Sequence, residues 1–327
     1  MKIAVTGGSG QIGVPLITEL IKQGHSVRAL IHNRNKGLEN LPIEFVNGNT
    51  LNPTDCDNLC KEMDAVFHLA AIVSINGDPD GKVMNINVNG TKNMLDACVK
   101  HKIQKMVHFS SIHAYDTQPT NEPLDETRAF AGENAFPYER SKATAQKMVH
   151  EYATKHNLNV SIINPTGVLG FPDYLPSIKG KLLIDFYNGK IPVLVPGGFD
   201  WVDVRDVVKT AISALHNGKA GESYLTSGKY YSVKDFAAII SKITGKKTPK
   251  TVAPLWLLNL SLPFISLYGK VTKTEPLYTS ESLKSLIEGN KTINNQKAQE
   301  QLGHTVRPIE ETLTDSYAWL KENNFIK

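Results

Sequence analysis

Short apolar runs alternate with segments of helical spacing through the first half of this 327-residue chain. The runs predict strands at residues 3–5, 26–31, 43–46, 65–69, 105–109 and 160–163, and the spacing predicts helices at 14–23, 53–62, 83–100 and 136–156. This alternation predicts an α/β fold, a parallel sheet covered by helices on both faces. Ligands bind such sheets at the carboxyl ends of the strands. Gly7, Ala70, Ser111 and Pro165 follow four of the predicted strands, so we expect them at one crevice.

The second half of the chain is less regular. Residues 192–195 and 201–207 suggest a return to the sheet, and residues 232–244 and 308–323 have the spacing of surface helices. Residues 254–268 are rich in Leu, Trp and Phe and are interrupted by Pro263. This segment is either a helix on a membrane surface or a cover over the substrate pocket. Few basic residues flank its polar side, which favours the cover.

A glycine-rich turn follows the first strand. Gly7, Gly10 and Gly13 lie three residues apart, and Gly8, Gly10 and Gly13 also satisfy G-x-G-x-x-G. Between a strand and a helix, this pattern is typical of dinucleotide binding. The glycines let the backbone approach a pyrophosphate, and the helix N-terminus offers it N–H groups. A loop without function is the alternative, but the flanking strand and helix favour a Rossmann-type, doubly wound sheet.

Tyr138 and Lys142 stand four residues apart in the predicted helix 136–156, so their side chains leave the same face one turn apart. Free Tyr titrates near ~10, and a nearby ammonium favours the phenolate and lowers that pKa. The phenol could then act as a general acid or base toward a hydroxyl or carbonyl group. Such pairs also arise by chance on helix surfaces, and the glycine turn is what favours a catalytic role here.

Composition limits the possible classes of protein. Hydrophobic residues make up 41% of the chain and charged residues 21%, and a net charge of +4 without a basic run does not suggest nucleic-acid binding. Cys56, Cys60 and Cys98 give no disulfide framework, fit a reducing compartment and lack the partners of a metal site. No stretch approaches ~18 uninterrupted apolar residues. We expect a cytoplasmic protein with no signal peptide, no membrane span and no metal.

Seven stretches carry a family resemblance: residues 6–13, 64–71, 87–91, 109–111, 138–142, 164–170 and 202–207. Together they resemble the extended short-chain dehydrogenases/reductases of the NAD(P)-dependent epimerase/dehydratase family, in the dihydroflavonol-reductase-like branch. The likeness covers nearly the whole chain. It implies an NAD(P)-binding Rossmann domain over residues 1–165. Residues 166–327 would be mainly substrate-binding, with some segments returning to the first domain.

The resemblance also implies the chemistry and the site. The protein would be an NAD(P)-dependent oxidoreductase that reduces an aldehyde or ketone, or oxidises the alcohol. Ser111 would hydrogen-bond the reacting oxygen, with Ser110 as its competitor, and Tyr138 would move the proton. Lys142 would lower the pKa of Tyr138 and hold the nicotinamide ribose, and the nicotinamide would carry the hydride. The implied cofactor-binding residues are Gly7, Gly10, Gln11, Ile12, Gly13, His32, Arg34, Asn49, Thr50, Leu69, Ala70, Ala71, Asn87, Tyr138, Lys142, Pro165, Gly167 and Val168.

Two departures from the family pattern concern the cofactor. Many relatives carry an Asp for the adenine amino group after the third strand, where this chain has Asn49, which still accepts a hydrogen bond. Many NAD users end the second strand with an acid for the ribose hydroxyls. Here His32, Arg34 and Lys36 follow that strand instead. The cations favour a 2′-phosphate and hence NADP, with NAD as the alternative, although they could simply coat a surface loop.

The substrate class is less well defined. Ile112 and His113 stand where similar sugar-nucleotide dehydratases carry an Asp-Glu pair, so dehydration is not expected. Asn164 precedes Pro165 as in the reductase-like branch, whereas epimerases often have Arg there. His113 could contact substrate or be a polar wall residue. A nucleotide-sugar epimerase with tightly bound NAD remains an alternative, and so does a non-catalytic NADP-sensing regulator, which the retained Tyr-Lys pair disfavours.

The family resemblance also indicates which partners to expect. We expect a small-molecule carbonyl or alcohol substrate, and neither nucleic acid nor a membrane as partner. Extended relatives commonly dimerise through two long helices, here residues 83–100 and 136–156. Met94, Leu95, Met148 and Val149 would contribute to such a homodimer contact, or would face the sheet instead.

Overall fold

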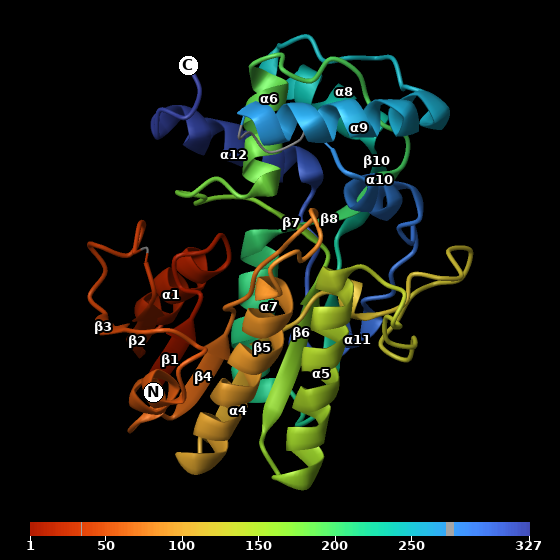
Figure 1. Cartoon of the computed structure of the whole chain (residues 1–327). Helices are drawn as coiled ribbons and strands as arrows, with labels where there is room; N and C mark the ends of the chain where they lie inside the picture. Colours follow the sequence, from red (N-terminus) through yellow and green to blue (C-terminus); the bar gives the residue numbers. More distant parts are fainter. Residues whose placement is uncertain (34, 273–277) are drawn as a thin grey trace.

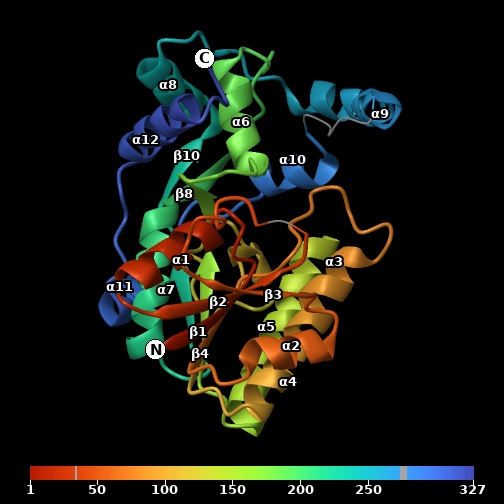
Figure 2. The same ribbon diagram turned by 90° about the vertical axis from the view of Figure 1, so that its left-hand side faces the viewer.

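The structure, a computed structural model, describes residues 1–33, 35–272 and 278–327, without the side chains of residues 264–272. Within these residues, seven parallel strands form a central sheet in the order β3-β2-β1-β4-β5-β6-β9 (Figures 1 and 2). The strands are β1 (Lys2–Thr6), β2 (Ser26–Ile31), β3 (Glu44–Asn47), β4 (Ala65–His68), β5 (Lys105–Phe109), β6 (Val160–Pro165) and β9 (Ser223–Thr226). The strand order reverses between β1 and β4, where a doubly wound sheet opens its ligand crevice.

Helices cover both faces of this sheet, as predicted. One apolar core joins it to α1 (Gly13–Lys22), α7 (Val204–Asn217) and α11 (Gln296–Leu302). The other joins it to α2 (Pro53–Cys60), α4 (Gly90–Lys100) and α5 (Pro137–Lys155). Five of these strands, β1, β4, β5, β6 and β9, are buried along nearly their whole length, as expected for parallel strands covered by helices on both faces.

The predicted helix 83–100 contains an irregular turn. It consists of α3 (Lys82–Met84), a π-helical turn η1 (Asn85–Asn89) and α4. Asn87 lies in the π-turn, is 2% exposed and bonds both main-chain groups of Ile72, accepting from N at 2.7 Å and donating to O at 3.0 Å. Its Nδ2 also donates to Ser141 Oγ at 2.9 Å. Asn87 therefore joins the loop after β4 to α5.

A smaller unit covers the carboxyl ends of the central strands (Figure 1). Its described strands form a sheet in the order β10-β8-β7, in which β8 pairs antiparallel with β10 and parallel with β7. These strands are β7 (Gly167–Leu169), β8 (Gly198–Asp203) and β10 (Lys229–Ser232). A separate apolar core joins this sheet to α6 (Ile178–Tyr187), α8 (Val233–Thr244) and α12 (Ile309–Glu322).

The predicted return to the central sheet is wrong in its location. Residues 198–203 do form a strand, β8, but it belongs to the small sheet. Residues 192–195 form no strand; Leu194 makes one isolated bridge to Val252. The strand that joins the central sheet is β9, which pairs with β6. The pattern of residues predicts that a segment forms a strand, but it does not predict which strand it pairs with. A buried strand of this kind could therefore belong to either sheet.

The apolar segment 254–268 is part of one helix, α9 (Leu255–Thr272), which contains Pro263. Leu258 is buried, whereas Trp256 is 67% exposed and Leu260 62% exposed. None of residues 254–263 lines the cavity described below, but Leu258 packs against Leu283 of the next helix, so the cover stays a prediction. The rest of the segment has no described side chains. The next helix, α10 (Ser280–Ile287), lines the cavity instead. No helix in the described parts of the chain is long and apolar enough to cross a membrane.

The four apolar residues proposed for a dimer contact face the protein interior. Met94, Leu95 and Val149 have no exposed surface, and Met148 packs against the same core between the sheet and α4 and α5. The alternative, that these residues face the sheet, is therefore confirmed for Met94, Leu95 and Val149, while Met148 is only partly buried. The exposed residues on these two helices include Lys92, Asp96, Lys147 and Glu151.

Candidate active site

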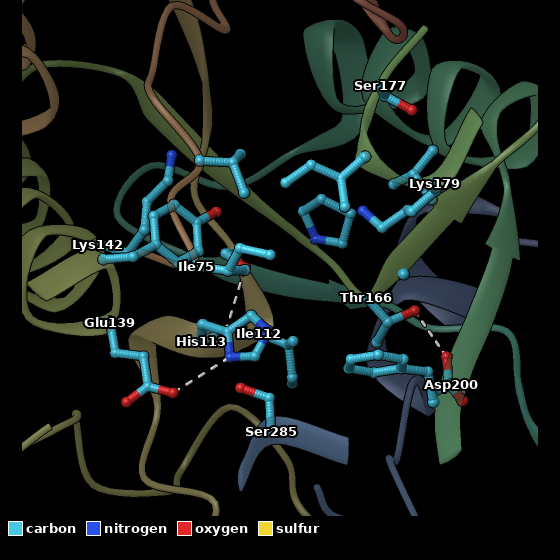
Figure 3. Close-up of a pocket in the computed structure, with 18 of the residues that line it drawn as sticks. Ile75, Ile112, His113, Glu139, Lys142, Thr166, Ser177, Lys179, Asp200 and Ser285 are labelled. Atoms are coloured by element: carbon cyan, nitrogen blue, oxygen red, sulfur yellow. Dashed lines mark hydrogen bonds and ion pairs between the residues drawn. The ribbon is translucent and has the colours of Figure 1, made fainter. Parts of the chain in front are cut away.

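A cavity of about 470 Å³ lies between the carboxyl ends of the central strands and the smaller unit (Figure 3). It is lined by residues that follow β1, β4, β5 and β6, the four strands whose ends were predicted from the sequence to meet at one crevice. Among the residues predicted for the site, those that line it are Gly7, Gly10, Gln11, Ile12, Gly13, Leu69, Ala71, Ser111, Tyr138, Lys142, Pro165, Gly167 and Val168. The structure thus brings the glycine turn and the Tyr-Lys pair to one cavity.

The glycine turn is shaped for close backbone approach. Gly7 has φ +71°, and a Cβ there would lie 2.8 Å from Ala70 N. A Cβ on Gly13 would lie 2.3 Å from Gly7 O. No side chain caps the start of α1, and no backbone acceptor among the described residues meets the N–H groups of Gln11, Ile12 and Gly13, so these groups remain available to a ligand. This cradle fits the pyrophosphate of a dinucleotide, the group that the sequence pattern implies.

Tyr138 and Lys142 lie in the first turns of α5. Pro137 occupies the first turn of the helix, and Phe136 N donates to Glu139 Oε2 at 3.1 Å, which fixes the helix start. Both side chains consequently face the cavity from one side of the helix. Lys142 is 5% exposed, and its ammonium donates to Phe109 O at 3.1 Å, at the end of β5.

The pKa values of this pair differ from the sequence-based expectation. Burial raises the pKa of Tyr138 to about 12, and a hydrogen bond with the Ser111 side chain opposes this shift. The expected lowering of the Tyr138 pKa is therefore wrong for the structure as it stands, because desolvation of the phenolate dominates. Burial likewise lowers the pKa of Lys142 to about 8, since the ammonium gives up water for a single carbonyl.

Ser111 is held by a buried amide network. Asn164 Nδ2 donates to Ser111 O at 2.9 Å and to Gln146 Oε1 at 2.7 Å. Ser111 Oγ accepts from His113 N at 3.2 Å and so caps the short helix η2 (Ile112–Ala114). Ser110 also lines the cavity, but its Oγ has no hydrogen-bond partner among the described residues, whereas the Ser111 side chain acts to lower the pKa of Tyr138. This geometry favours Ser111 over its neighbour for the role beside Tyr138.

His113 and Glu139 come together in the cavity wall, a contact that the sequence did not predict. His113 Nδ1 lies 3.6 Å from Glu139 Oε1 (Figure 3), and the His113 ring meets Tyr138 edge-on at 5.9 Å. Burial alone would raise the pKa of Glu139, but hydrogen bonding and charge from His113 lower it. Glu139 follows Tyr138 directly, but only the folded loop shows that His113 reaches it.

The far wall of the cavity comes from the smaller unit. Thr166 Oγ1 donates to Asp200 Oδ1 at 2.6 Å (Figure 3), and Asp200 Oδ1 also accepts from Gly228 N. Phe199 and Trp201, on β8, stand beside this pair, and the Trp201 ring stacks on Phe236 at 5.0 Å. Further apolar lining comes from Ile75, Ile112, Ile178, Leu182 and Ile293. These residues come from distant segments, and no local sequence signal identifies them.

Several predicted cofactor residues lie outside this cavity lining: His32, Asn49, Thr50, Ala70 and Asn87. His32 is exposed, and Arg34 lies outside the described residues. Asn49 N donates to Asp55 Oδ2 at 2.8 Å, while Asn49 Oδ1 accepts from Leu51 N at 3.0 Å. Asn49 therefore shapes its own loop, and its role toward adenine stays a prediction.

The fold and the cavity are those of a dinucleotide-dependent enzyme. The model of the NAD dependent epimerase/dehydratase family matches residues 3–226, and the chain belongs to this family. Sterol demethylase protein B of Methylococcus capsulatus is 27% identical over 330 residues, covering 100% of both chains. A putative dihydroflavonol 4-reductase of Synechocystis is 30% identical, covering 99% of this chain and 95% of the relative. The predicted dihydroflavonol-reductase-like family and the Rossmann-type fold are thereby confirmed.

Solved structures agree with this placement. The crystal structure of gox2253 superimposes with a TM-score of 0.86 at 27% identity, over 100% of this chain and 99% of that one. UDP-glucuronic acid 4-epimerase of Bacillus cereus, solved with UDP-glucuronic acid and NAD, has a TM-score of 0.79 at 21% identity, over 99% and 100% of the two chains, and shares the fold. This chain is therefore an NAD(P)-dependent oxidoreductase of the extended short-chain type.

Proposed function

We propose that this enzyme reduces an aldehyde or ketone, or oxidises the corresponding alcohol, with Tyr138 as the general acid or base. The observation that supports the proposal is the convergence of Tyr138, Lys142 and Ser111 on the cavity that also contains the glycine turn. A bound nicotinamide supplies hydride exchange. Ser111 donates a hydrogen bond to the reacting oxygen, and Tyr138 passes a proton to the same atom. Lys142 binds the nicotinamide ribose and places a positive charge beside Tyr138.

The protonation states suit the reducing direction at neutral pH. Tyr138 is protonated there, because burial raises its pKa to about 12, and so it is ready to donate. Lys142 is largely charged there, since its pKa of about 8 lies above neutrality. In the oxidising direction, Tyr138 must first lose its proton, so the alcohol reaction should be favoured by alkaline pH.

The cavity wall supports an apolar substrate. Its lining includes Ile178, Leu182, Phe199 and Trp201 on the far side and Ile293 elsewhere, which suit a hydrocarbon skeleton better than a nucleotide sugar. Two relatives are named for substrates with a large apolar framework. They are a farnesyl-dihydroquinoline-oxide ketoreductase of Stigmatella aurantiaca and a 3-beta-hydroxysteroid dehydrogenase of Mycolicibacterium neoaurum. We infer that the substrate carries its carbonyl or hydroxyl on a largely apolar framework.

NADP is the proposed dinucleotide. No acid follows β2, whereas His32, Arg34 and Lys36 do, and charge-assisted contacts to a 2′-phosphate would favour NADP(H) over NAD(H). The Arg34→Ala variant should lose much of this preference when dissociation constants for the two dinucleotides are measured by fluorescence titration. Equal or tighter binding of NAD(H) by the unmodified protein would contradict the proposal.

A nucleotide-sugar epimerase is the second candidate. A putative UDP-glucose 4-epimerase of Methanocaldococcus jannaschii is 29% identical over 73% of this chain. Such an enzyme would purify with oxidised NAD bound and would convert a UDP-sugar. A non-catalytic NADP-sensing regulator is the weakest candidate, because the cavity retains both Tyr138 and Lys142.

A screen of apolar ketones, aldehydes and nucleotide sugars, followed by NADPH absorbance, tests the proposal. With an active substrate, Tyr138→Phe should lower kcat by at least ~10²-fold, the range for a lost general acid, with little change in cofactor affinity. Lys142→Met should lose both rate and cofactor affinity, and Ser111→Ala mainly rate. The triple variant should be barely worse than Tyr138→Phe, because residues that act as a unit do not add. A Tyr138→Phe enzyme that keeps most of its kcat would identify another proton donor.

We also place the enzyme in the cytoplasm, where the free buried thiols of Cys56, Cys60 and Cys98 would stay reduced.

A homodimer through α4 and α5 remains our proposal for its assembly, now through exposed polar residues such as Lys92 and Lys147. Light scattering at micromolar concentration decides this point, because a single species near the chain mass of 36.0 kDa would exclude the dimer.

A further inference from the structure

Lys179 lies in the first turn of α6 and lines the cavity on the side opposite Lys142. In Figure 3, its ammonium points into the cavity from the smaller unit, whereas Lys142, His113 and Glu139 occupy the other side. The backbone at this point is well fixed, since Ser177 caps the helix by accepting from Gly180 N at 3.1 Å. Lys179 thus has a defined position beside the substrate space.

No hydrogen bond or ion pair joins the Lys179 ammonium to another described residue. Asp173 is the opposing charge that acts on Lys179, but its Oδ2 already accepts from Ser177 N and Ser177 Oγ, each at 2.9 Å. Burial lowers the pKa of Lys179, and the charge of Asp173 only partly offsets this. The ammonium is therefore desolvated without receiving a partner.

The surroundings make this an unfavourable place for a lone charge. Ile178 and Leu182, on the same helix, and Phe199 and Trp201, on β8, line the same side of the cavity. A cation placed against apolar walls costs free energy unless an anion or a hydrogen-bond acceptor meets it. The other lysine of the cavity, Lys142, has an acceptor in Phe109 O, whereas Lys179 has none among the described residues.

We propose that Lys179 binds a carboxylate on the substrate, so that the substrate class is an apolar carbonyl or hydroxy compound with one acidic group. This proposal rests on the proposed function, which supplies the reacting carbonyl or hydroxyl group, and it adds a carboxylate at another point of the substrate. A single ammonium among apolar side chains balances one negative charge. A phosphate dianion is usually met by Arg or by several charged donors, and no Arg is among the described residues that line the cavity. The apolar walls would hold the framework between the carboxylate and Tyr138.

The competing occupant is the pyrophosphate of the dinucleotide. The turn at Gly7 to Gly13 and the uncapped start of α1 already form a cradle for that group. Lys179 belongs to a different element in the smaller unit. Loss of Lys179 should therefore weaken the binding of a carboxylate and leave dinucleotide binding unchanged.

Calorimetric titration of the NADP⁺-saturated protein with decanoate and with decanamide tests this assignment. The two probes share an apolar chain and differ in charge, and neither contains a reducible ketone. The unmodified protein should bind decanoate more tightly than decanamide. Lys179→Met should weaken the binding of decanoate by about 10-fold or more, because a charge-assisted contact is lost. The affinity for decanamide should change by less than about twofold. Lys181→Met is the matched control on the same helix, because Lys181 does not line the cavity.

Three results would overturn the proposal. One is equal loss of decanoate and decanamide affinity in Lys179→Met, which would indicate a general packing defect. Another is weaker NADP⁺ binding by that variant, which would assign Lys179 to the dinucleotide. The third is no preference for decanoate in the unmodified protein. None of these readouts requires turnover, so a failure of hydride transfer would count against the proposed function and leave this assignment standing.

Discussion

Asn164, at the end of β6, holds Ser111, at the end of β5, through a hydrogen bond from its amide Nδ2 to the main-chain oxygen of Ser111, 2.9 Å long. Asn164 has no exposed surface and also donates to Gln146 Oε1, so its orientation is fixed from two sides. Gln146 Nε2 in turn donates to Tyr115 Oη at 2.9 Å. In the proposed reaction, Asn164 would act as a positioning residue for Ser111.

Replacing Asn164 should therefore affect catalysis through Ser111. Asn164→Ala should lower kcat by about 10-fold, because Ser111 loses its alignment with the reacting oxygen, and should leave the dissociation constant for NADPH unchanged. The check is a double-mutant cycle with Ser111→Ala. In the Ser111→Ala background, Asn164→Ala should change kcat very little. Independent, additive losses would show that Asn164 acts by some other route.

The glycine turn should not tolerate a methyl group at Gly13. A Cβ there would lie 2.3 Å from Gly7 O and 2.5 Å from Gly8 O, so the turn must open to admit it. Gly13→Ala should raise the dissociation constant for NADPH by at least about 10-fold, as measured by fluorescence titration. Gly132→Ala is the matched control, because a Cβ at Gly132 meets nothing within 4 Å. Unchanged binding by Gly13→Ala would place the pyrophosphate elsewhere.

A buried histidine pair behind the site should make the protein sensitive to acid. The rings of His68 and His108 stack at 5.4 Å, and neither ring nitrogen of His108 has a hydrogen-bond partner among the described residues. Burial lowers the pKa of His68 to about 3 and that of His108 well below its ordinary value. The unfolded chain, with an ordinary pKa of about 6.5, binds more protons than the folded chain as the pH falls below that value. The free energy of unfolding therefore falls with pH in this window.

His108→Leu should remove one of these two contributions. Between pH 7 and pH 5, the variant should lose about 2 kcal/mol less free energy of unfolding than the unmodified protein. Urea denaturation at the two pH values measures this difference, and any packing cost of the substitution cancels in the comparison. If His108→Leu proved as acid-sensitive as the unmodified protein, His108 would have to be protonated in the folded state.

Local patterns in the sequence predicted the elements of the central sheet well. The first six predicted strands agree with the structure to within about two residues at each end, because buried parallel strands are short apolar runs between polar turns. The strand β9 escaped prediction because its four residues include Ser223 and Thr226, which weaken the apolar signal. The π-turn at Asn87 has no signature of its own, since the residues around it keep ordinary helical spacing.

The site was predictable where one segment carries its own chemistry. The glycine turn and the Tyr138–Lys142 pair are local motifs, and both line the cavity. Lys179, Asp200 and the His113–Glu139 pair depend on loops from distant segments that meet only in the folded chain. The direction of the Tyr138 pKa was also beyond local reasoning, because the desolvation of a phenol depends on every element packed around it.

Trp201 gives the protein an internal optical reporter. Its indole lies in the cavity wall, is 6% exposed and stacks on Phe236, whereas Trp256 on α9 is 67% exposed. A collisional quencher in solution would suppress the emission of Trp256 and spare that of Trp201. The remaining signal would come mainly from side chains shielded from solvent, and a ligand that enters the cavity would perturb it directly. Compounds that are never turned over could then be ranked by their effect on this emission, without radioactive or dye labels.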